Sequence, residues 1–220
     1  ATDLAIVESF SHSVVWDTSD GLMCFDASGA GSGEAVVQSI RTWRDSPIST
    51  LVYTHGHADH VGGSMMGMNI EGVSTLLELQ PVPIHVNTNE ATWVTRTTGI
   101  SDTDLVKHSG GDKLRVGEIE ITFVHTPGHT PGSQCFLVAQ RLVAGDTLFL
   151  EGCGRTDLPG SDPGQMFSSL QKLSEMPPDT LVCPGHQYSA MPSSNLGDVV
   201  ATNHVFKPQT QEQWLEWFGR

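Results

Sequence analysis

Apolar positions along the chain switch between the spacing of strands and the spacing of helices. Short apolar runs bounded by turn residues predict strands. Asp20-Gly21, between the first two runs, predicts a hairpin because this dipeptide tolerates the positive φ of a tight turn. The predicted strands span residues 13–16, 22–25, 50–53, 84–86, 118–124, 135–138, 142–144 and 180–182.

Helical spacing separates these strands in both halves of the chain. In residues 34–43 the apolar positions recur with the helical period, and Pro47 ends the segment. Further helices are predicted at residues 73–79, 89–97, 163–175 and 211–218. Residues 192–203 are poor in apolar side chains, and we expect them to run irregularly over the surface. Such interleaving predicts an α/β fold, with two mixed sheets packed together and helices on their outer faces.

Length and composition narrow the class of protein. The chain has 220 residues and no internal repeat, which predicts one domain over residues 1–220. No apolar stretch approaches the 18 residues of a membrane span, so no membrane partner is expected. The net charge of −14, from 25 acidic and 11 basic residues, disfavours a nucleic-acid partner.

The cysteines argue against two kinds of scaffold. They form neither a CxxC pair nor a regular framework, so we expect no disulfide scaffold and no structural zinc site. No secretion signal opens the sequence, and a cytoplasmic location is therefore expected. The four cysteines are Cys24, Cys135, Cys153 and Cys183.

Histidine and aspartate side chains gather directly behind the predicted strands. Three imidazoles and one carboxylate fall within six residues after the strand at 50–53, and two later histidines each follow a Pro-Gly turn. Neutral imidazole and carboxylate are the preferred ligands of zinc and ferrous iron. The sequence therefore predicts a metal site. Its candidate ligands are His55, His57, Asp59, His60, His129, Asp146 and His186.

The remaining histidines stand apart from this pattern. We expect each to be a surface residue or a satisfied core residue. They are His12, His85, His108, His125 and His204. His125 is close to His129 in the sequence, and we expect it to face the other way along its strand.

The order HxHxDH, then His, Asp and His, resembles the metallo-β-lactamase superfamily over residues 14–188. The resemblance implies an αββα sandwich with two divalent metal ions at the sheet edge, most often zinc, with iron or manganese as alternatives. It assigns His55, His57 and His129 to the first ion, Asp59, His60 and His186 to the second, and Asp146 to both. A metal-bridging hydroxide would be the nucleophile. Asp59 would in addition orient it or relay its proton.

One further segment resembles a particular branch of that superfamily. Residues 145–149, followed by Gly152-Cys153-Gly154-Arg155, are similar to glyoxalase II (hydroxyacylglutathione hydrolase) and to persulfide dioxygenases. The first resemblance implies a metal-dependent hydrolase of a thioester or similar activated acyl bond. The second implies oxidation of a persulfide by one iron, held by His55, His129 and Asp146.

Other activities fit the sequence less well. True metallo-β-lactamases lack a bridging carboxylate near Asp146, so β-lactam hydrolysis becomes a further alternative, together with lactone hydrolysis. A non-enzymatic binding role would not need all seven ligands. The chain ends 34 residues beyond His186, a shorter tail than the helical domain of glyoxalase II, so glutathione as the thiol stays open.

Several side chains near the motifs have two interpretations. Arg155 either contacts an anionic group of the substrate or forms a salt bridge with Asp157. Tyr188 either donates a hydrogen bond to a substrate oxyanion or packs. Cys153 and Trp93 either face the site or lie in the core. We expect a small-molecule substrate, an anionic acyl or sulfur compound, and helix 211–218 leaves an oligomer possible.

Overall fold

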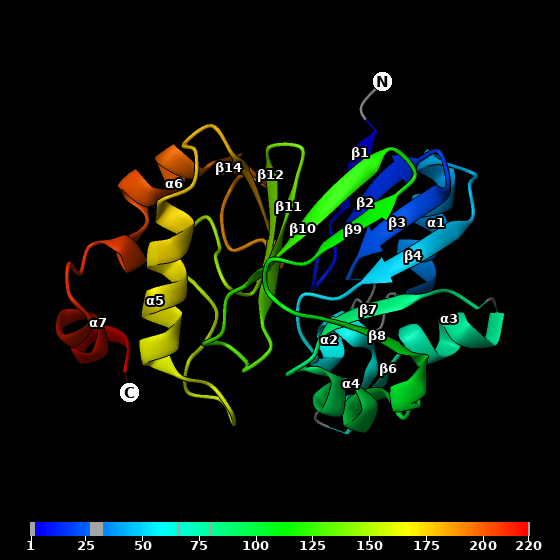
Figure 1. Cartoon of the computed structure of the whole chain (residues 1–220), viewed down its shortest axis with the longest axis horizontal. Helices are drawn as coiled ribbons and strands as arrows, with labels where there is room; N and C mark the ends of the chain where they lie inside the picture. The colour runs from blue at the N-terminus through cyan, green and yellow to red at the C-terminus, as the bar shows by residue number, and fades with distance from the viewer. Residues whose placement is uncertain (1–2, 27–32, 66, 80, 220) are drawn as a thin grey trace.

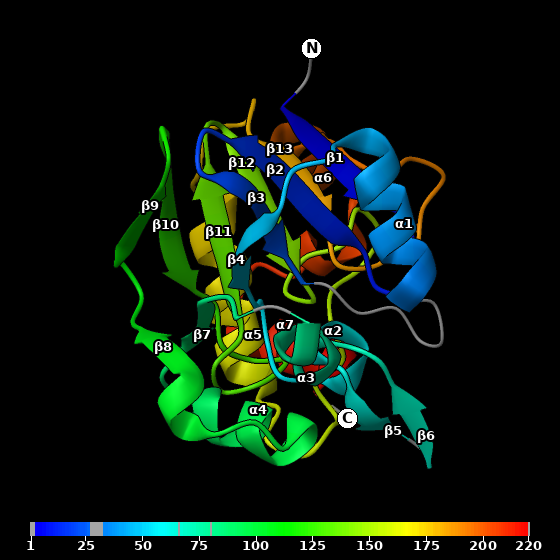
Figure 2. The same ribbon diagram turned by 90° about the vertical axis from the view of Figure 1, so that its right-hand side faces the viewer.

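Two six-stranded sheets lie face to face, with helices on both outer faces (Figures 1 and 2). The structure is a computed structural model that describes residues 3–26, 33–65, 67–79 and 81–219. The predicted αββα sandwich is confirmed. That residues 1–220 form one folding unit stays a prediction.

The first sheet follows the order β1-β2-β3-β4-β7-β8, and its last four strands are parallel. The hairpin expected at Asp20-Gly21 joins β2 to β3, with Val14 opposite Phe25. Short strands β5 (Gly63–Met65) and β6 (Met68–Ile70) form a separate hairpin. The strands are β1 (Leu4–Val7), β2 (Ser13–Thr18), β3 (Gly21–Phe25), β4 (Ile48–Val52), β7 (Ile84–Asn87) and β8 (Leu105–His108). The helices of this half are α1 (Gly33–Trp43), the one-turn α2 (Ala58–Val61), α3 (Val73–Leu79), α4 (Ala91–Thr98) and the 3₁₀ turn η1 (Asp102–Asp104).

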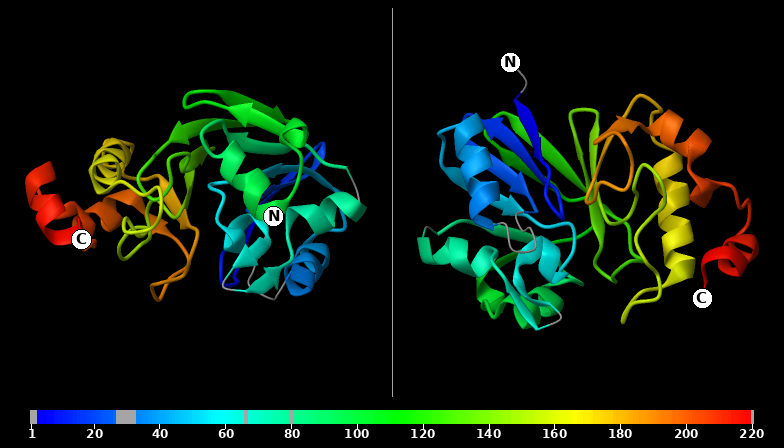
Figure 3. Two further views of the ribbon diagram at one scale, coloured as in Figure 1. Left: turned by 90° about the horizontal axis from the view of Figure 1, so that it is seen from below. Right: turned by 180° about the vertical axis from the view of Figure 1, so that it is seen from behind.

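The second sheet follows the order β14-β13-β12-β11-β10-β9 and is antiparallel except between β12 and β13. Helix α5 begins where the Asp162 side chain accepts a hydrogen bond from the Gln165 N–H, with Pro163 in its first turn. Seen from behind and from below, α5, α6 and α7 cover the outer face of this sheet (Figure 3). The strands are β9 (Lys113–Val116), β10 (Ile119–His125), β11 (Gln134–Val138), β12 (Arg141–Gly145), β13 (Leu181–Pro184) and β14 (Ser194–Asn195). The helices are α5 (Pro163–Ser174), α6 (Leu196–Thr202), the 3₁₀ turn η2 (His204–Phe206) and α7 (Gln211–Phe218).

Alternation along the strands divides the core into layers. Val14 and Trp16 pack in the cluster between the two sheets, whereas Val15 packs with α1, α3 and α4. This is the two-residue period of a strand buried on both faces. On the far side, Trp214 of α7 packs with α5 against the second sheet. Each buried side chain of this size contributes about 1.5–3 kcal/mol to folding.

The expectation for residues 192–203 is wrong. They form the edge strand β14 and helix α6, and Leu196 and Val199 are buried in the same cluster as α5. These two side chains, with the partly buried Val200, follow a helical spacing of three and four residues. This short apolar stripe is enough to pack the helix against the core, although the segment as a whole is polar.

Within the described ranges, no helix is long and apolar enough to cross a membrane.

A histidine pair lies where the edge of the first sheet meets the second. His85 Nδ1 and His108 Nε2 are 2.8 Å apart, and the His108 ring stacks on Phe123 of β10 with centroids 4.1 Å apart. Burial and the neighbouring imidazole lower the pKa of His85 to about 4. The fold therefore holds this ring uncharged.

Stability should depend on pH through His85. The unfolded imidazole takes up a proton near pH 6.5 and the folded one only near pH 4. Between these values the unfolded state binds more protons, so stability is lost as the pH falls. His85→Asn keeps a hydrogen-bonding side chain and removes this proton. As the pH falls across this window, the unfolding free energy of the variant should decrease less steeply than that of the wild type. The two slopes should differ by up to about 1.4 kcal/mol per pH unit.

Urea unfolding of both proteins at several pH values between 4 and 6.5 measures this slope. His204→Asn, at an exposed position, is the matched control and should keep the wild-type slope. Equal slopes in His85→Asn and wild type would contradict the assignment.

Candidate metal centre

The seven candidate ligands meet at one edge of the stacked sheets. The first sheet supplies those that follow β4, and the second sheet supplies those that follow β10, β12 and β13. Asp59 and His60 lie on the one-turn helix α2, which begins directly behind His57. The structure thus brings together His55, His57, Asp59, His60, His129, Asp146 and His186.

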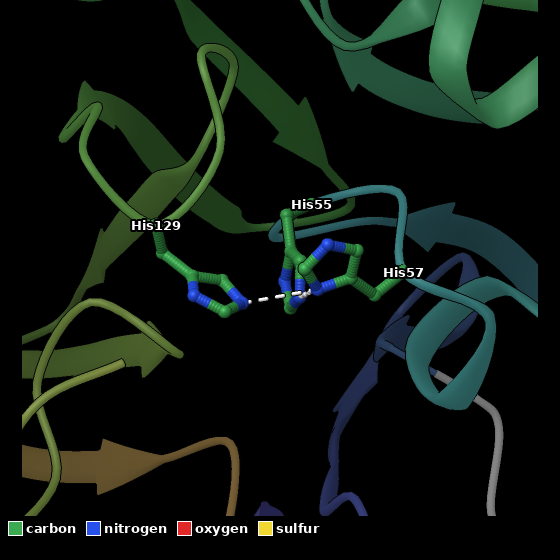
Figure 4. Close-up of side chains that lie close together, drawn as sticks. All are labelled: His55, His57 and His129. Atoms are coloured by element: carbon green, nitrogen blue, oxygen red, sulfur yellow. Dashed lines mark hydrogen bonds between the residues drawn. The ribbon is translucent and has the colours of Figure 1, made fainter. Parts of the chain in front are cut away.

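Three imidazoles form the first part of the cluster (Figure 4). His57 Nδ1 lies 3.2 Å from His55 Nε2 and 3.0 Å from His129 Nε2. Two nitrogens that bind one tetrahedral zinc ion at about 2.0–2.1 Å are roughly 3.3 Å apart. The three nitrogens therefore fit one ion with little adjustment.

A carboxylate and two imidazoles form the second part. His60 Nε2 and His186 Nε2 are 3.3 Å apart, and His186 Nε2 lies 3.4 Å from Asp59 Oδ2. Asp146 lies between the two parts, with Oδ1 3.3 Å from His60 and Oδ2 3.7 Å from His129. Its position suits a carboxylate shared by two ions.

Four of the five rings are held by a hydrogen bond on the nitrogen that faces away from the cluster. His129 Nδ1 donates to the Arg155 carbonyl at 2.8 Å, and His186 Nδ1 donates to the Phe10 carbonyl. The Nδ1 atoms of His55 and His60 contact Thr54 Oγ1 and Asp26 Oδ2. These contacts fix the tautomer that leaves Nε2 free for a metal ion.

Asp26 contacts the candidate ligand His60 and was not predicted from the sequence. Its carboxylate accepts from the Thr54 N–H at 2.8 Å and from the Thr54 hydroxyl at 2.6 Å, besides contacting His60. Its backbone has φ 49°, an unusual conformation for a residue other than glycine. A signal was present, because Asp26 directly follows β3 as the other acidic and histidine residues follow their strands.

Glu90 was also missed, and its buried carboxylate joins two ligand loops. It accepts from the Gly56 N–H at 2.9 Å, between His55 and His57, and from the Gly132 N–H at 2.8 Å, behind His129. The Thr130 hydroxyl donates a third bond at 2.9 Å. A Cβ at Gly132 would lie 2.4 Å from Glu90 Oε2, so this approach requires glycine. No local sequence pattern singles out Glu90.

The two parts of the cluster differ in charge. Burial lowers the pKa of His57 to about 4 and holds that of His55 well below its usual value. Burial acts the same way on His186, but hydrogen bonds to Asp146 and Asp59 outweigh it and raise its pKa to about 9. The second part therefore carries protons that a metal ion would displace.

A cleft of about 910 Å³ opens onto the cluster. Arg155 lines it, but its guanidinium forms two 2.8 Å hydrogen bonds with Asp157. Tyr188 stacks on His186 with ring centroids 5.3 Å apart, so its ring reaches the site. Trp93 is a wall of the cleft. Cys153 also lines it, and burial raises the pKa of this thiol to about 12, which keeps it protonated.

The other histidines lie outside the cluster. His12 is buried near His186, and its backbone N–H donates to the Gly185 carbonyl. His125 Nε2 lies 2.9 Å from the Pro131 carbonyl, and His204 packs beside Phe218.

Known proteins resemble this chain in sequence. Residues 8–186 match the metallo-beta-lactamase superfamily. A hydroxyacylglutathione hydrolase of Erwinia tasmaniensis is 31% identical over 210 residues, 96% of this chain and 73% of that protein. The probable polyketide biosynthesis zinc-dependent hydrolase BaeB of Bacillus velezensis is 28% identical over 177 residues, 80% of this chain and 73% of that protein.

The fold has solved counterparts. The crystal structure of ETHE1 from Myxococcus xanthus superposes with a TM-score of 0.80 and 23% identity, over 99% of this chain and 90% of that chain. The chain belongs to the metallo-β-lactamase superfamily of metal-dependent hydrolases.

Proposed function

We propose that the chain is a dinuclear metallo-hydrolase that cleaves thioesters or similarly activated acyl bonds. The observation that carries the proposal is the convergence of seven metal-binding side chains at the base of an open cleft. In this proposal His55, His57 and His129 would hold one zinc ion, Asp59, His60 and His186 would hold a second, and Asp146 could serve both.

Thioester cleavage is supported by the surroundings of the cluster. Cys153, Gly154 and Arg155, whose sequence resembles the glyoxalase II segment, line the cleft beside the ligands. The relatives named above include a hydrolase of hydroxyacylglutathione and a zinc-dependent hydrolase of polyketide biosynthesis. Water would add to the thioester carbonyl, the C–S bond would break, and a carboxylic acid and a thiol would leave.

Each protein group has a distinct task in this reaction. When bound, the ions supply water of lowered pKa and positive charge for the developing oxyanion. Hydrogen bonding by His186 and the charge of His60 outweigh burial and hold the pKa of Asp59 below its usual value, so Asp59 stays an anion. It can therefore orient the attacking water and receive its proton.

Tyr188 suits the task of a neutral donor. Burial and the charges of Asp146 and Asp59 raise the pKa of its phenol, which keeps the proton available for a hydrogen bond to the substrate oxyanion. Arg155 is the candidate contact for a polar group of the substrate, once its bond to Asp157 yields.

Asp59→Ala tests the proposal because it removes a ligand and the proton acceptor together. We expect zinc content to fall from about two ions to about one, and thioesterase activity to fall by about 100-fold or more. Elemental analysis and thiol release measure the two effects. Asp104→Ala, at an exposed position, is the control. Wild-type turnover by Asp59→Ala would refute the assigned role.

The alternative activity, a persulfide dioxygenase, would use one iron at His55, His129 and Asp146. His129 Nε2 and Asp146 Oδ2 are 3.7 Å apart, a separation compatible with one ion. Metal content of protein purified without added metal separates the two reactions. We expect about two zinc ions per chain and no oxygen consumption with glutathione persulfide. One iron per chain with rapid oxygen uptake would favour the dioxygenase.

Glu90 acts as a positioning residue for the first ion, since its carboxylate fixes the backbone on both sides of that site. Glu90→Gln replaces one carboxylate oxygen, a hydrogen-bond acceptor, by an NH₂ group, which is a donor. This NH₂ group would face an N–H or hydroxyl donor that the carboxylate oxygen had accepted from. We expect the zinc affinity of the site formed by His55, His57 and His129 to fall by about 10- to 100-fold.

Competition with a fluorescent zinc chelator measures this affinity without relying on activity. Glu118→Gln, at an exposed turn that contacts Ser19, is the matched control. Unchanged zinc affinity in a folded Glu90→Gln protein would show that Glu90 only supports the fold.

A further inference from the structure

The cleft above the metal centre has aromatic walls on both sides. On the side of the proposed second ion, Phe10, Phe149 and Tyr188 all contact the His186 ring, with centroids 5.2, 5.9 and 5.3 Å away. On the opposite side Trp93 meets the His57 ring at 6.2 Å. An apolar group bound at the centre would therefore be enclosed between the two walls.

Much of this aromatic surface is open to solvent. Phe10 is 54% exposed, Tyr188 57% and Trp93 38%. The three come from separate segments, namely the loop before β2, the segment after β13, and helix α4. Large aromatic side chains gathered around a reactive centre are typical of a surface that buries an apolar ligand.

The charged side chains that line the cleft also favour an uncharged ligand. Apart from the proposed metal ligands, Glu151 and Arg155 are the charged side chains lining the described part of the cleft. Asp157 already holds the Arg155 guanidinium through two hydrogen bonds, whereas Glu151 is exposed. A carboxylate on the thiol arm that does not reach the proposed ions would meet the like charge of Glu151 and would have to compete with Asp157 for Arg155.

We propose that the substrate is a thioester of an apolar acyl chain and an uncharged thiol arm, instead of a thioester of an anionic thiol such as glutathione. This inference rests on the proposed thioesterase activity. It departs from the anionic substrate expected from the sequence, because the Arg155 guanidinium is already hydrogen-bonded to Asp157, for which an anionic substrate would have to substitute.

Matched thioesters test the inference. An octanoyl group on N-acetylcysteamine, a neutral thiol, is compared with the same group on glutathione, which carries two carboxylates. We expect kcat/KM to be at least about tenfold higher on the neutral thiol, and to rise about tenfold or more from acetyl to octanoyl. Equal or faster hydrolysis of the glutathione thioester would overturn the inference.

A binding measurement separates this inference from the proposed function. If the zinc-loaded protein cleaves no thioester, the proposed function fails. The uncleavable octyl thioethers of the same two thiols still decide the substrate class by calorimetry. The neutral thioether should bind about tenfold more tightly. Equal affinity, tighter binding of the glutathione thioether, or binding of neither compound would reject the inference.

Variants identify the groups responsible. Trp93→Ala should reduce the gain in kcat/KM from acetyl to octanoyl, whereas Trp217→Ala, 58% exposed on α7 and outside the cleft, should leave it unchanged. Asp157→Asn frees Arg155 and should raise the glutathione thioester relative to the neutral one by about fivefold. An unchanged ratio in Asp157→Asn would contradict the charge argument.

Discussion

The apolar interface between the two sheets sets the position of every candidate ligand. The ligands come from both sheets, so distances of 3.0–3.3 Å between their nitrogens depend on how the sheets lie against each other. Phe25 packs against Phe136 across this interface with ring centroids 5.2 Å apart, and Asp26 is the next residue. Packing of Phe25 in the core therefore fixes the position of the neighbouring Asp26, which contacts the candidate ligand His60.

Sheet packing places the ligand-bearing segments, and hydrogen bonds then fix the orientation of the histidine rings. Asp26 joins the ends of β3 and β4 to α2 through Thr54 and His60, while Glu90 joins the loops that follow β4 and β10. Both carboxylates are buried and both contact donors on separate segments. Because a buried acceptor without its donor is costly, these segments are held in one arrangement before any ion binds.

The sequence predicted the sandwich and the ligand cluster because both leave a local record. Short apolar runs such as residues 22–25 mark the buried strands, and the ligand motifs directly follow strands. The roles of Asp26 and Glu90 depend on segments brought together by folding, and Glu90 contacts backbone N–H groups 34 and 42 residues away. Edge strands β1, β8, β9 and β14 were missed because they are short and partly exposed. The pairing of Arg155 with Asp157 was one of two interpretations that the sequence left open.

The contact between Phe10 and His186 has a consequence for how the protein matures. The Phe10 carbonyl that holds the His186 ring lies 176 residues away in the chain, and His12 contacts Gly185 beside it. His186 is the last of the seven candidate ligands in the sequence, and its ring is held only when folding has brought residues 10 and 186 together. Contacts of such sequence separation carry a loop-closure entropy cost and slow folding. The His186 part of the candidate site therefore depends on a long-range contact of the fold, whereas His55 and His57 are close neighbours in the sequence.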